Sequence, residues 1–205
     1  MGLKNALKNN PSLKKFIHWT LIPSGQARPR FWVKWFVNPF FHSKKTGSIV
    51  RSRTRMDVFP FNRFETGRYT VIEDFCTVNN GVGDVLIGEN VTIGMSNVLI
   101  GPLRIGNKVI IAQNVVISGL NHNYEDVSMP IQAQGVRTAP IVIADDCWIG
   151  ANVVITAGIT IGKHCVIAAG SVVTKSIPNF CVVAGNPARI IKKYDAAQNA
   201  WLKVN

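Results

Sequence analysis

The stretch IGENVTIGMSNVLIGPLRIGNKVIIAQNVVIS, residues 87–118, places an aliphatic residue at every sixth position. These residues are Ile87, Ile93, Leu99, Ile105, Ile111 and Ile117, and after an interruption the count resumes at Ile143, Ile149, Ile155, Ile161, Ile167 and Val173. A period of six fits neither the 3.6-residue period of a helix nor the alternation of a long strand. It predicts short strands joined by tight corners, three to a triangular coil, with stacked coils burying the aliphatic column.

The other positions of the repeat agree with this reading. The residue after the aliphatic one is small at many steps, namely Gly88, Gly94, Gly106, Ala112, Ala144, Gly150, Gly162 and Ala168. The remaining positions carry Asn, Asp, Lys, Gln and Gly, which are residues of turns. We expect strands of successive coils to lie about 4.8 Å apart, as in any β-ladder.

This pattern resembles the hexapeptide-repeat acyltransferases, and the similarity runs from about Ile72 to Lys193. The resemblance implies an all-β fold, a left-handed parallel β-helix; the left hand comes from the family alone, because parallel crossovers generally favour the right hand. We divide the chain into a basic, aromatic-rich and partly helical N-terminal segment (1–65), the β-helix acyltransferase domain (66–188) and a C-terminal tail with a short helix (189–205).

The charge of the chain is concentrated in its N-terminal third. The formal net charge is +12, and residues 1–68 alone hold 14 Lys and Arg against 2 Asp and Glu, so the repeat region is neutral. No run of 18 apolar residues predicts a membrane span, and no secretory leader is apparent, which favours the cytoplasm. Cys76, Cys147 and Cys165 each follow a repeat aliphatic by four residues, which predicts core positions rather than a disulfide or metal site.

The N-terminal third carries a predicted helix and an aromatic cluster. The helix begins near Asn10, with Pro11 in its first turn. The stretch RPRFWVKWFVNPFFHSKK, residues 28–45, interleaves Arg and Lys with Phe and Trp. Two interpretations stay open: a cap on the open end of the solenoid, or a peripheral anchor on an anionic membrane. We do not expect nucleic acid binding, because no motif of that kind is present.

The repeat is interrupted by GLNHNYEDVSMPIQAQG, residues 119–135, which predicts an extruded loop at about 118–140. Ile117 and Ile143 are 26 residues apart, where whole hexads would give 24. His122 lies where the loop leaves the coil. The resemblance implies that it is the catalytic general base, which accepts the proton of an acceptor hydroxyl or amine as that group attacks the thioester of acetyl-CoA. We expect Glu125 or a backbone carbonyl to orient the ring.

The stretch from Asp145 to Lys193 resembles the acetyl-CoA-binding end of the family. The resemblance implies coenzyme contacts for Trp148, Ala151, Ala169, Thr174, Lys175, Arg189 and Lys192. Arg and Lys suit the phosphates of the coenzyme. Residues expected to contact the acceptor are Asn97, Asn121, Tyr124 and Glu125. No metal is expected.

The resemblance also implies a homotrimer with its active sites at the subunit interfaces. The expected reaction is O-acetylation of a sugar or glycan precursor, and an amine or amino acid is the alternative acceptor. A non-enzymatic β-helix scaffold stays open, because a fold does not fix a function. A zinc site like that of β-helical carbonic anhydrases requires several converging histidines, and beyond the N-terminal region the chain has only His122 and His164.

Overall fold

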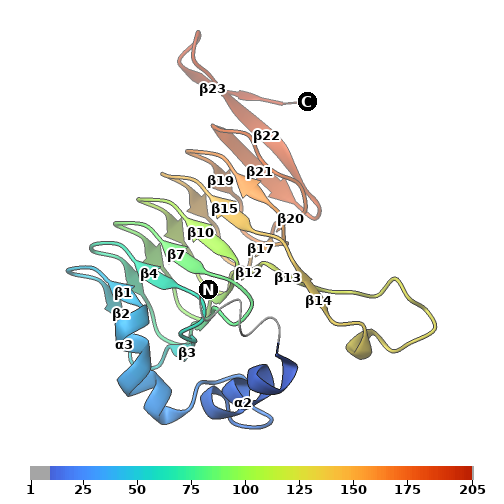
Figure 1. Cartoon of the computed structure of the whole chain (residues 1–205). Helices are drawn as coiled ribbons and strands as arrows, with labels where there is room; N and C mark the ends of the chain where they lie inside the picture. The colour runs from blue at the N-terminus through green and yellow to red at the C-terminus, as the bar shows by residue number, and fades with distance from the viewer. Residues whose placement is uncertain (1–9, 205) are drawn as a thin grey trace.

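A computed structural model describes residues 10–204, and it confirms a parallel β-helix built from three sheets around one core (Figure 1). Sheet A contains β1 (Ser43–Lys44), β4 (Phe64–Thr66), β7 (Val85–Ile87), β10 (Leu103–Ile105), β15 (Ile141–Ile143) and β18 (Thr160–Ile161). Sheet B contains β2 (Ile49–Val50), β5 (Val71–Ile72), β8 (Thr92–Ile93), β11 (Ile110–Ile111), β16 (Trp148–Ile149), β19 (Val166–Ile167) and β21 (Cys181–Gly185). Sheet C contains β3 (Arg55–Asp57), β6 (Thr77–Asn79), β9 (Val98–Ile100), β12 (Val116–Ser118), β17 (Val154–Ile155) and β20 (Val172–Val173).

The repeat aliphatics form the core in register. Ile111, for example, pairs with Ile93 in the preceding coil and with Ile149 in the following coil, and all three side chains are buried. The cysteines are buried as predicted and carry free thiols; Cys147 donates to the carbonyl oxygen of Gly162 at 3.1 Å. The chain is thus a left-handed parallel β-helix of the predicted class.

The six-residue period follows from the corners between the strands. A residue with positive φ lies three positions before many of the inward aliphatics, as at Asn90, Asn114 and Asn152. Asn tolerates this left-handed conformation better than most residues. The small residue after each aliphatic has a different cause: a Cβ on Gly88 would lie 2.5 Å from the carbonyl oxygen of Gly106 in the next coil.

The β-helix begins earlier than predicted. Strands β1, β2 and β3 form a complete first coil, since they pair with β4, β5 and β6, so the boundary between residues 65 and 66 is wrong. Lys44, Val50 and Met56 occupy its inward register positions at a spacing of six, but the next such residue, Thr66, comes ten later. A lysine in an aliphatic position and this longer corner hide the first coil in the sequence.

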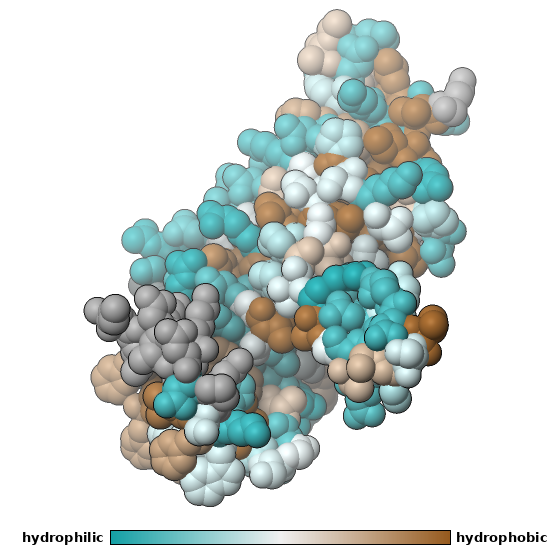
Figure 2. All heavy atoms as spheres, turned by 45° about the vertical axis from the view of Figure 1, so that its right-hand side comes forward, coloured by the Kyte–Doolittle hydropathy of each residue, from teal (hydrophilic) through white to brown (hydrophobic). Residues whose placement is uncertain are grey.

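Short helices lie at the N-terminal end of the stack (Figure 1). Helix α2 (Pro11–Leu21) begins as predicted, with the Asn10 side chain accepting from the Leu13 amide at 3.0 Å. A π-helix (Val33–Val37) continues directly into α3 (Asn38–Phe41). The side-chain NH2 of Asn38 donates to the backbone carbonyl oxygen of Val58 at 2.8 Å. Val33 and Asn38 are buried, whereas many of the aromatic rings stay exposed. Figure 2 shows tan and brown surface, with paler surface beside it, at this end of the molecule.

The predicted C-terminal helix is wrong. Residues 188–203 instead form an antiparallel extension of sheet B, with β22 (Ala188–Asp195) pairing with β21 and β23 (Ala200–Lys203) pairing with β22. Asp195 caps the connecting turn by accepting from the amides of Ala197 and Gln198. Aromatic contacts select strand over the intrinsic helix propensity of the alanines, because Trp201 packs on Tyr194 at 5.5 Å between ring centroids.

Within residues 10–204, no helix is long and apolar enough to cross a membrane.

Candidate active site

The interruption of the repeat is an ordered excursion from one corner of the prism, between β12 of sheet C and β15 of sheet A (Figure 1). Its bounds agree with the prediction. Its two arms pair as an antiparallel ribbon, β13 (Leu120–His122) and β14 (Val136–Thr138), and a 3-10 turn (Ile131–Ala133) lies near the tip. His122 therefore lies at the end of a hydrogen-bonded strand, opposite Val136.

Side-chain hydrogen bonds hold the loop together beyond the ribbon. The side-chain NH2 of Gln134 donates to the backbone carbonyl oxygens of Asp126 at 2.7 Å and Met129 at 3.1 Å. Its side-chain oxygen accepts from the backbone N–H of Asp126. The Asn123 side chain donates to Gln134 O at 3.0 Å. The loop is exposed, but these contacts fix the position of its backbone beside the histidine.

The His122 ring is exposed and bonds to no other described residue of the chain. The suggested contact with Glu125 is not made. Glu125 accepts from the Tyr124 amide at 3.0 Å and from the Arg137 guanidinium, and these contacts hold its pKa at about 2. Glu125 is thus an anion above that pH and has no proton to donate. The Arg137 guanidinium lies 5.8 Å from the centre of the Tyr124 ring and belongs to this cluster, although no role was predicted for it.

Asn97 is not available to an acceptor, contrary to prediction. The residue is fully buried, and its amide nitrogen donates to Gly94 O at 2.7 Å and Ala112 O at 2.8 Å. Its oxygen accepts from the Val115 amide at 2.6 Å. Asn97 follows Ile93 by four residues, the same inward position that the cysteines occupy, so the repeat itself contained the information that placed it in the core. Asn121 and Tyr124 remain exposed beside His122.

Replacing Asn97 with alanine is expected to lower the free energy of unfolding by about 1–3 kcal/mol, because buried backbone groups of Gly94, Ala112 and Val115 lose their partner. The KM for the acceptor should not change. Urea unfolding and steady-state kinetics measure the two effects, with the exposed Asn121→Ala as the matched variant that should leave stability unchanged. A higher acceptor KM at unchanged stability would show that Asn97 has a binding role.

The predicted coenzyme residues gather near the C-terminal end of the stack. Trp148, Val166, Val182 and Lys192 are consecutive partners across sheet B, on its outward face. Three strand spacings make this track about 14 Å long. The track begins at Trp148, which is 54% exposed, and ends at the cation of Lys192.

The other predicted coenzyme residues flank this track. Ala151 and Ala169 lie at the corner between sheets B and C, where the Gly170 amide donates to Ala151 O at 2.8 Å. Thr174 and Lys175 are exposed directly after β20, and Arg189 is exposed on β22. The arrangement offers an apolar surface, small side chains and three cations.

His122 and Trp148 lie on opposite sides of the prism. The loop leaves the corner between sheets C and A, and sheet B is the side that faces away from that corner. One chain alone therefore does not bring the histidine to the coenzyme residues. A second chain that packs its sheet B against sheet C of the first would do so.

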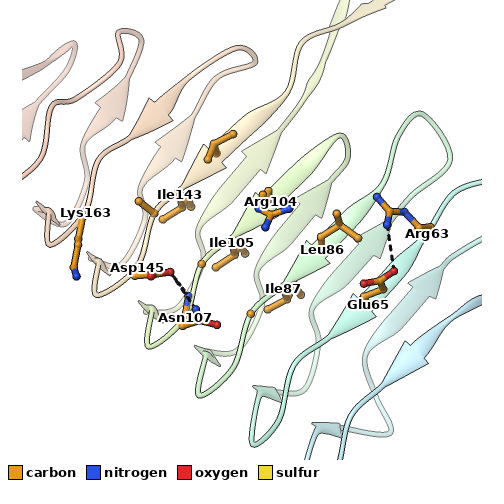
Figure 3. A pocket seen from close by; sticks show the side chains of 14 residues that line it. Arg63, Glu65, Leu86, Ile87, Arg104, Ile105, Asn107, Ile143, Asp145 and Lys163 are labelled. Atoms are coloured by element: carbon orange, nitrogen blue, oxygen red, sulfur yellow. Dashed lines mark hydrogen bonds and ion pairs between the residues drawn. The ribbon is translucent and has the colours of Figure 1, made fainter.

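A cavity of about 510 Å³ lies away from these residues. It lies along the outside of sheet A and is lined by charged side chains such as Arg63, Glu65, Arg104 and Lys163 (Figure 3). Its charges partly pair with each other and with the backbone: Arg63 lies 3.6 Å from Glu65, and Asp145 accepts from the Asn107 amide at 2.7 Å. This surface marks sheet A as a polar face, and we assign it no part in catalysis.

His164 lies apart from the loop, with its ring against Trp201 at 6.3 Å. It is exposed. Among residues 10–204, no three His, Cys, Asp or Glu side chains are placed to hold a metal ion.

Comparison with known proteins agrees with this fold. The model of the bacterial transferase hexapeptide family (six repeats) matches residues 84–119 and 140–175. A probable acetyltransferase of Mycobacterium tuberculosis is 34% identical over 68% of this chain and 49% of its own length, so the chain spans about half of that relative. The putative lipopolysaccharide biosynthesis O-acetyl transferase WbbJ of Escherichia coli is 33% identical over 60% of this chain and 67% of its own length.

Among solved structures, the hexapeptide-repeat acetyltransferase VCA0836 of Vibrio cholerae, determined with acetyl coenzyme A, aligns with a TM-score of 0.54. It is 26% identical, and the alignment covers 95% of this chain and 92% of that one. The β-helix and the extruded loop define the class of protein as a hexapeptide-repeat transferase. The chain belongs to the bacterial transferase hexapeptide family, whose relatives named above are acetyltransferases.

Proposed function

We propose that the chain transfers an acetyl group from acetyl-CoA to a hydroxyl of a sugar or glycan precursor. The observation that carries the proposal is His122 at the end of the β13–β14 ribbon, at the corner where the extruded loop leaves the coil. An imidazole can accept a proton near neutral pH, and a fixed backbone holds it in place for that step.

In the proposed reaction His122 accepts the proton of the acceptor hydroxyl while the oxygen attacks the thioester carbonyl. The C–S bond of the tetrahedral intermediate then breaks, and the coenzyme leaves as a thiolate that takes up the proton. No covalent acyl-enzyme is required. The buried thiols agree with this, since none of the four is exposed.

We propose a homotrimer in which each site lies between two chains. Sheet B presents Ile110 and Trp148 outward, and sheet C presents Val98, Val116 and Val154. Ile110, Val116 and Trp148 are exposed in the single chain. Sheet A instead presents the charged Glu65 and Arg104 in one row with Leu86 and Val142. Two sides that are more apolar and one side that carries these charges suit cyclic packing of B against C, which brings His122 of one chain toward Trp148 of the next.

The coenzyme would lie along the outward track of sheet B. Trp148 would contact the pantetheine arm, and Ala151 and Ala169 would leave room for it. Thr174, Lys175, Arg189 and Lys192 would bind the nucleotide and its phosphates. The Escherichia coli relative named for lipopolysaccharide O-acetylation supports an envelope-glycan precursor as the acceptor, and we place the reaction in the cytoplasm.

Titration of the free thiol released from acetyl-CoA, with a panel of free and nucleotide-linked sugars, tests the proposal. A sugar that raises thiol release above the rate of hydrolysis, and that is recovered with one acetate ester, supports it. Release only with amine acceptors would favour an N-acetyltransferase. Failure to bind CoA in calorimetry would leave the scaffold interpretation.

We also propose that the N-terminal helices contact an anionic membrane. Phe31, Phe36 and Phe40 are 73%, 68% and 85% exposed, and the first 56 residues contain no Asp or Glu. Basic residues and exposed rings together suit the headgroup region of such a bilayer.

Replacing Phe31, Phe36 and Phe40 together with serine is expected to lower binding to anionic vesicles by at least tenfold. Insertion of each ring contributes about 1.5–3 kcal/mol if it is fully removed from water. Co-sedimentation of the full-length chain with anionic and with neutral vesicles measures the effect. Equal sedimentation of the variant and the parent would contradict the contact.

A further inference from the structure

Two adjoining cavities lie between the first coil and the N-terminal helices, and Lys34 and Met56 line both of them. One cavity measures about 450 Å³ and the other about 310 Å³. Neither contains a residue of the proposed acetyl-transfer site. A pocket of several hundred cubic ångströms is within the range of small-molecule sites.

The smaller cavity is strongly basic. Arg28, Lys34, Arg53 and Arg55 line it, and Asp57 is its only acidic residue. Asp57 is buried; its Oδ2 pairs with Arg55 at 2.7 Å, and its Oδ1 is buried without a hydrogen-bond partner. No ion pair within the described part of the chain neutralises the other three cations. Three uncompensated cations around one cavity favour an anion, and Arg is well suited to phosphate oxygens.

The larger cavity is mostly apolar. Trp35 and Pro39 of the helical segment face Met56, Val58 and Phe64 of the coil across it. Val58 and Phe64 are buried members of the core cluster, so this wall is preformed by the solenoid itself. A hydrocarbon chain placed here would lose contact with water without displacing any ion pair.

Two polar atoms in the larger cavity lack a partner, which is unusual for buried groups. The Phe64 amide donates to Nδ1 of His42 at 3.3 Å, so in the neutral ring Nε2 carries the hydrogen. Burial lowers the pKa of His42, which favours that neutral form. His42 Nε2 and Asn38 Oδ1 are both buried without a hydrogen bond. His42 Nε2–H can donate a hydrogen bond and Asn38 Oδ1 can accept one. A hydroxyl of a ligand could pair with both atoms, and so could an ester oxygen next to a hydroxyl.

We propose that the two cavities form one site for a lipid phosphate. The hydrocarbon chain occupies the apolar cavity, the phosphate lies among Arg28, Lys34 and Arg53, and the oxygens that join them reach His42. The shared residues Lys34 and Met56 mark the passage from the charged part to the apolar part. The inference goes beyond acetyl transfer and beyond general contact with a bilayer, since it assigns a stoichiometric site to a single amphiphile.

Calorimetry with monomeric octyl phosphate and the full-length chain tests the site. We expect one site per chain, with an affinity at least tenfold higher than for inorganic phosphate or for octyl glucoside, which has the same chain and no charge. Arg28→Gln and Lys34→Gln should each weaken octyl phosphate binding by about tenfold or more. Arg68→Gln removes an exposed cation outside both cavities and should change it less than twofold.

The Trp35→Ala variant distinguishes the contribution of the hydrocarbon chain to binding from that of the phosphate. It should weaken octyl phosphate binding while leaving the weak binding of inorganic phosphate unchanged. Thermal unfolding of each variant verifies the fold, and Arg53→Gln replaces any variant that fails to fold. The absence of saturable binding, or an equal loss in Arg68→Gln, would overturn the site. Octyl glucoside binding as tight as octyl phosphate would show an apolar pocket without phosphate specificity. None of these readouts depends on acetyl transfer.

Discussion

Replacing His122 with alanine is expected to lower kcat for acetyl transfer by about 10²–10⁴-fold, the usual contribution of a positioned general base. Because the side chain is exposed and forms no hydrogen bond to described residues of its own chain, its removal should leave the stability of the protomer unchanged. The KM for acetyl-CoA should change little, since the residues proposed to bind the coenzyme lie on another face of the protomer. Thiol release under saturating acetyl-CoA measures kcat. His164→Ala is the histidine control on a different part of the surface, and thermal unfolding verifies that this variant keeps its fold, because the His164 ring packs on Trp201.

The proposed location of the site between two chains adds a complementation experiment to this prediction. His122→Ala and Trp148→Ala chains, each inactive as a homotrimer, should regain activity when they are co-refolded. In random mixed trimers about a quarter of the interfaces join an intact His122 to an intact Trp148, if each site uses one chain for each residue. Activity near that fraction supports a shared site. No recovery in verified mixed trimers would mean that each site takes both residues from the same chain. Unchanged turnover in His122→Ala would show that His122 has no part in the mechanism.

The repeated part of the fold was predictable because one strict six-residue period determines which residues point inward, where the corners lie and how successive coils pair. The inward residues from Ile87 to Val173, the corners and the bounds of the loop all follow from one six-residue pattern. Prediction weakened where that pattern is perturbed. The first inward register position is taken by Lys44, and Thr66 follows Met56 by ten residues instead of six. The six-residue pattern therefore does not reveal the first coil.

The candidate site was predictable only in part. The exit of the loop located His122, and the inward position of Asn97 was readable from its spacing to Ile93. The pairing of Glu125 with Arg137 was not predictable, since these residues are 12 apart in the chain and meet only through the register of the ribbon. Strand β23 likewise forms because of distant contacts, such as those of Trp201 with Tyr194 and His164, which local helix propensity does not reveal.

Adjacent isoleucines of strand β11 should respond very differently to truncation. Ile111 points inward and is 1% exposed, whereas Ile110 points outward and is 54% exposed. Ile111→Ala is expected to lower the free energy of unfolding by about 2–5 kcal/mol, through lost burial and the cavity that remains between the coils on either side. Ile110→Ala should change the unfolding of the isolated protomer by only about 0.5 kcal/mol or less.

The two variants also separate core packing from subunit packing. Ile110 lies on the sheet B face that the proposed trimer covers, so Ile110→Ala should raise the concentration at which trimers dissociate, while Ile111→Ala lowers the urea midpoint at any concentration. Urea unfolding and sedimentation velocity measure the two effects. Equal stability loss in both variants would mean that β11 is not oriented as described. A trimer insensitive to Ile110→Ala would place the subunit interface elsewhere, and His122 would then need a different route to the thioester.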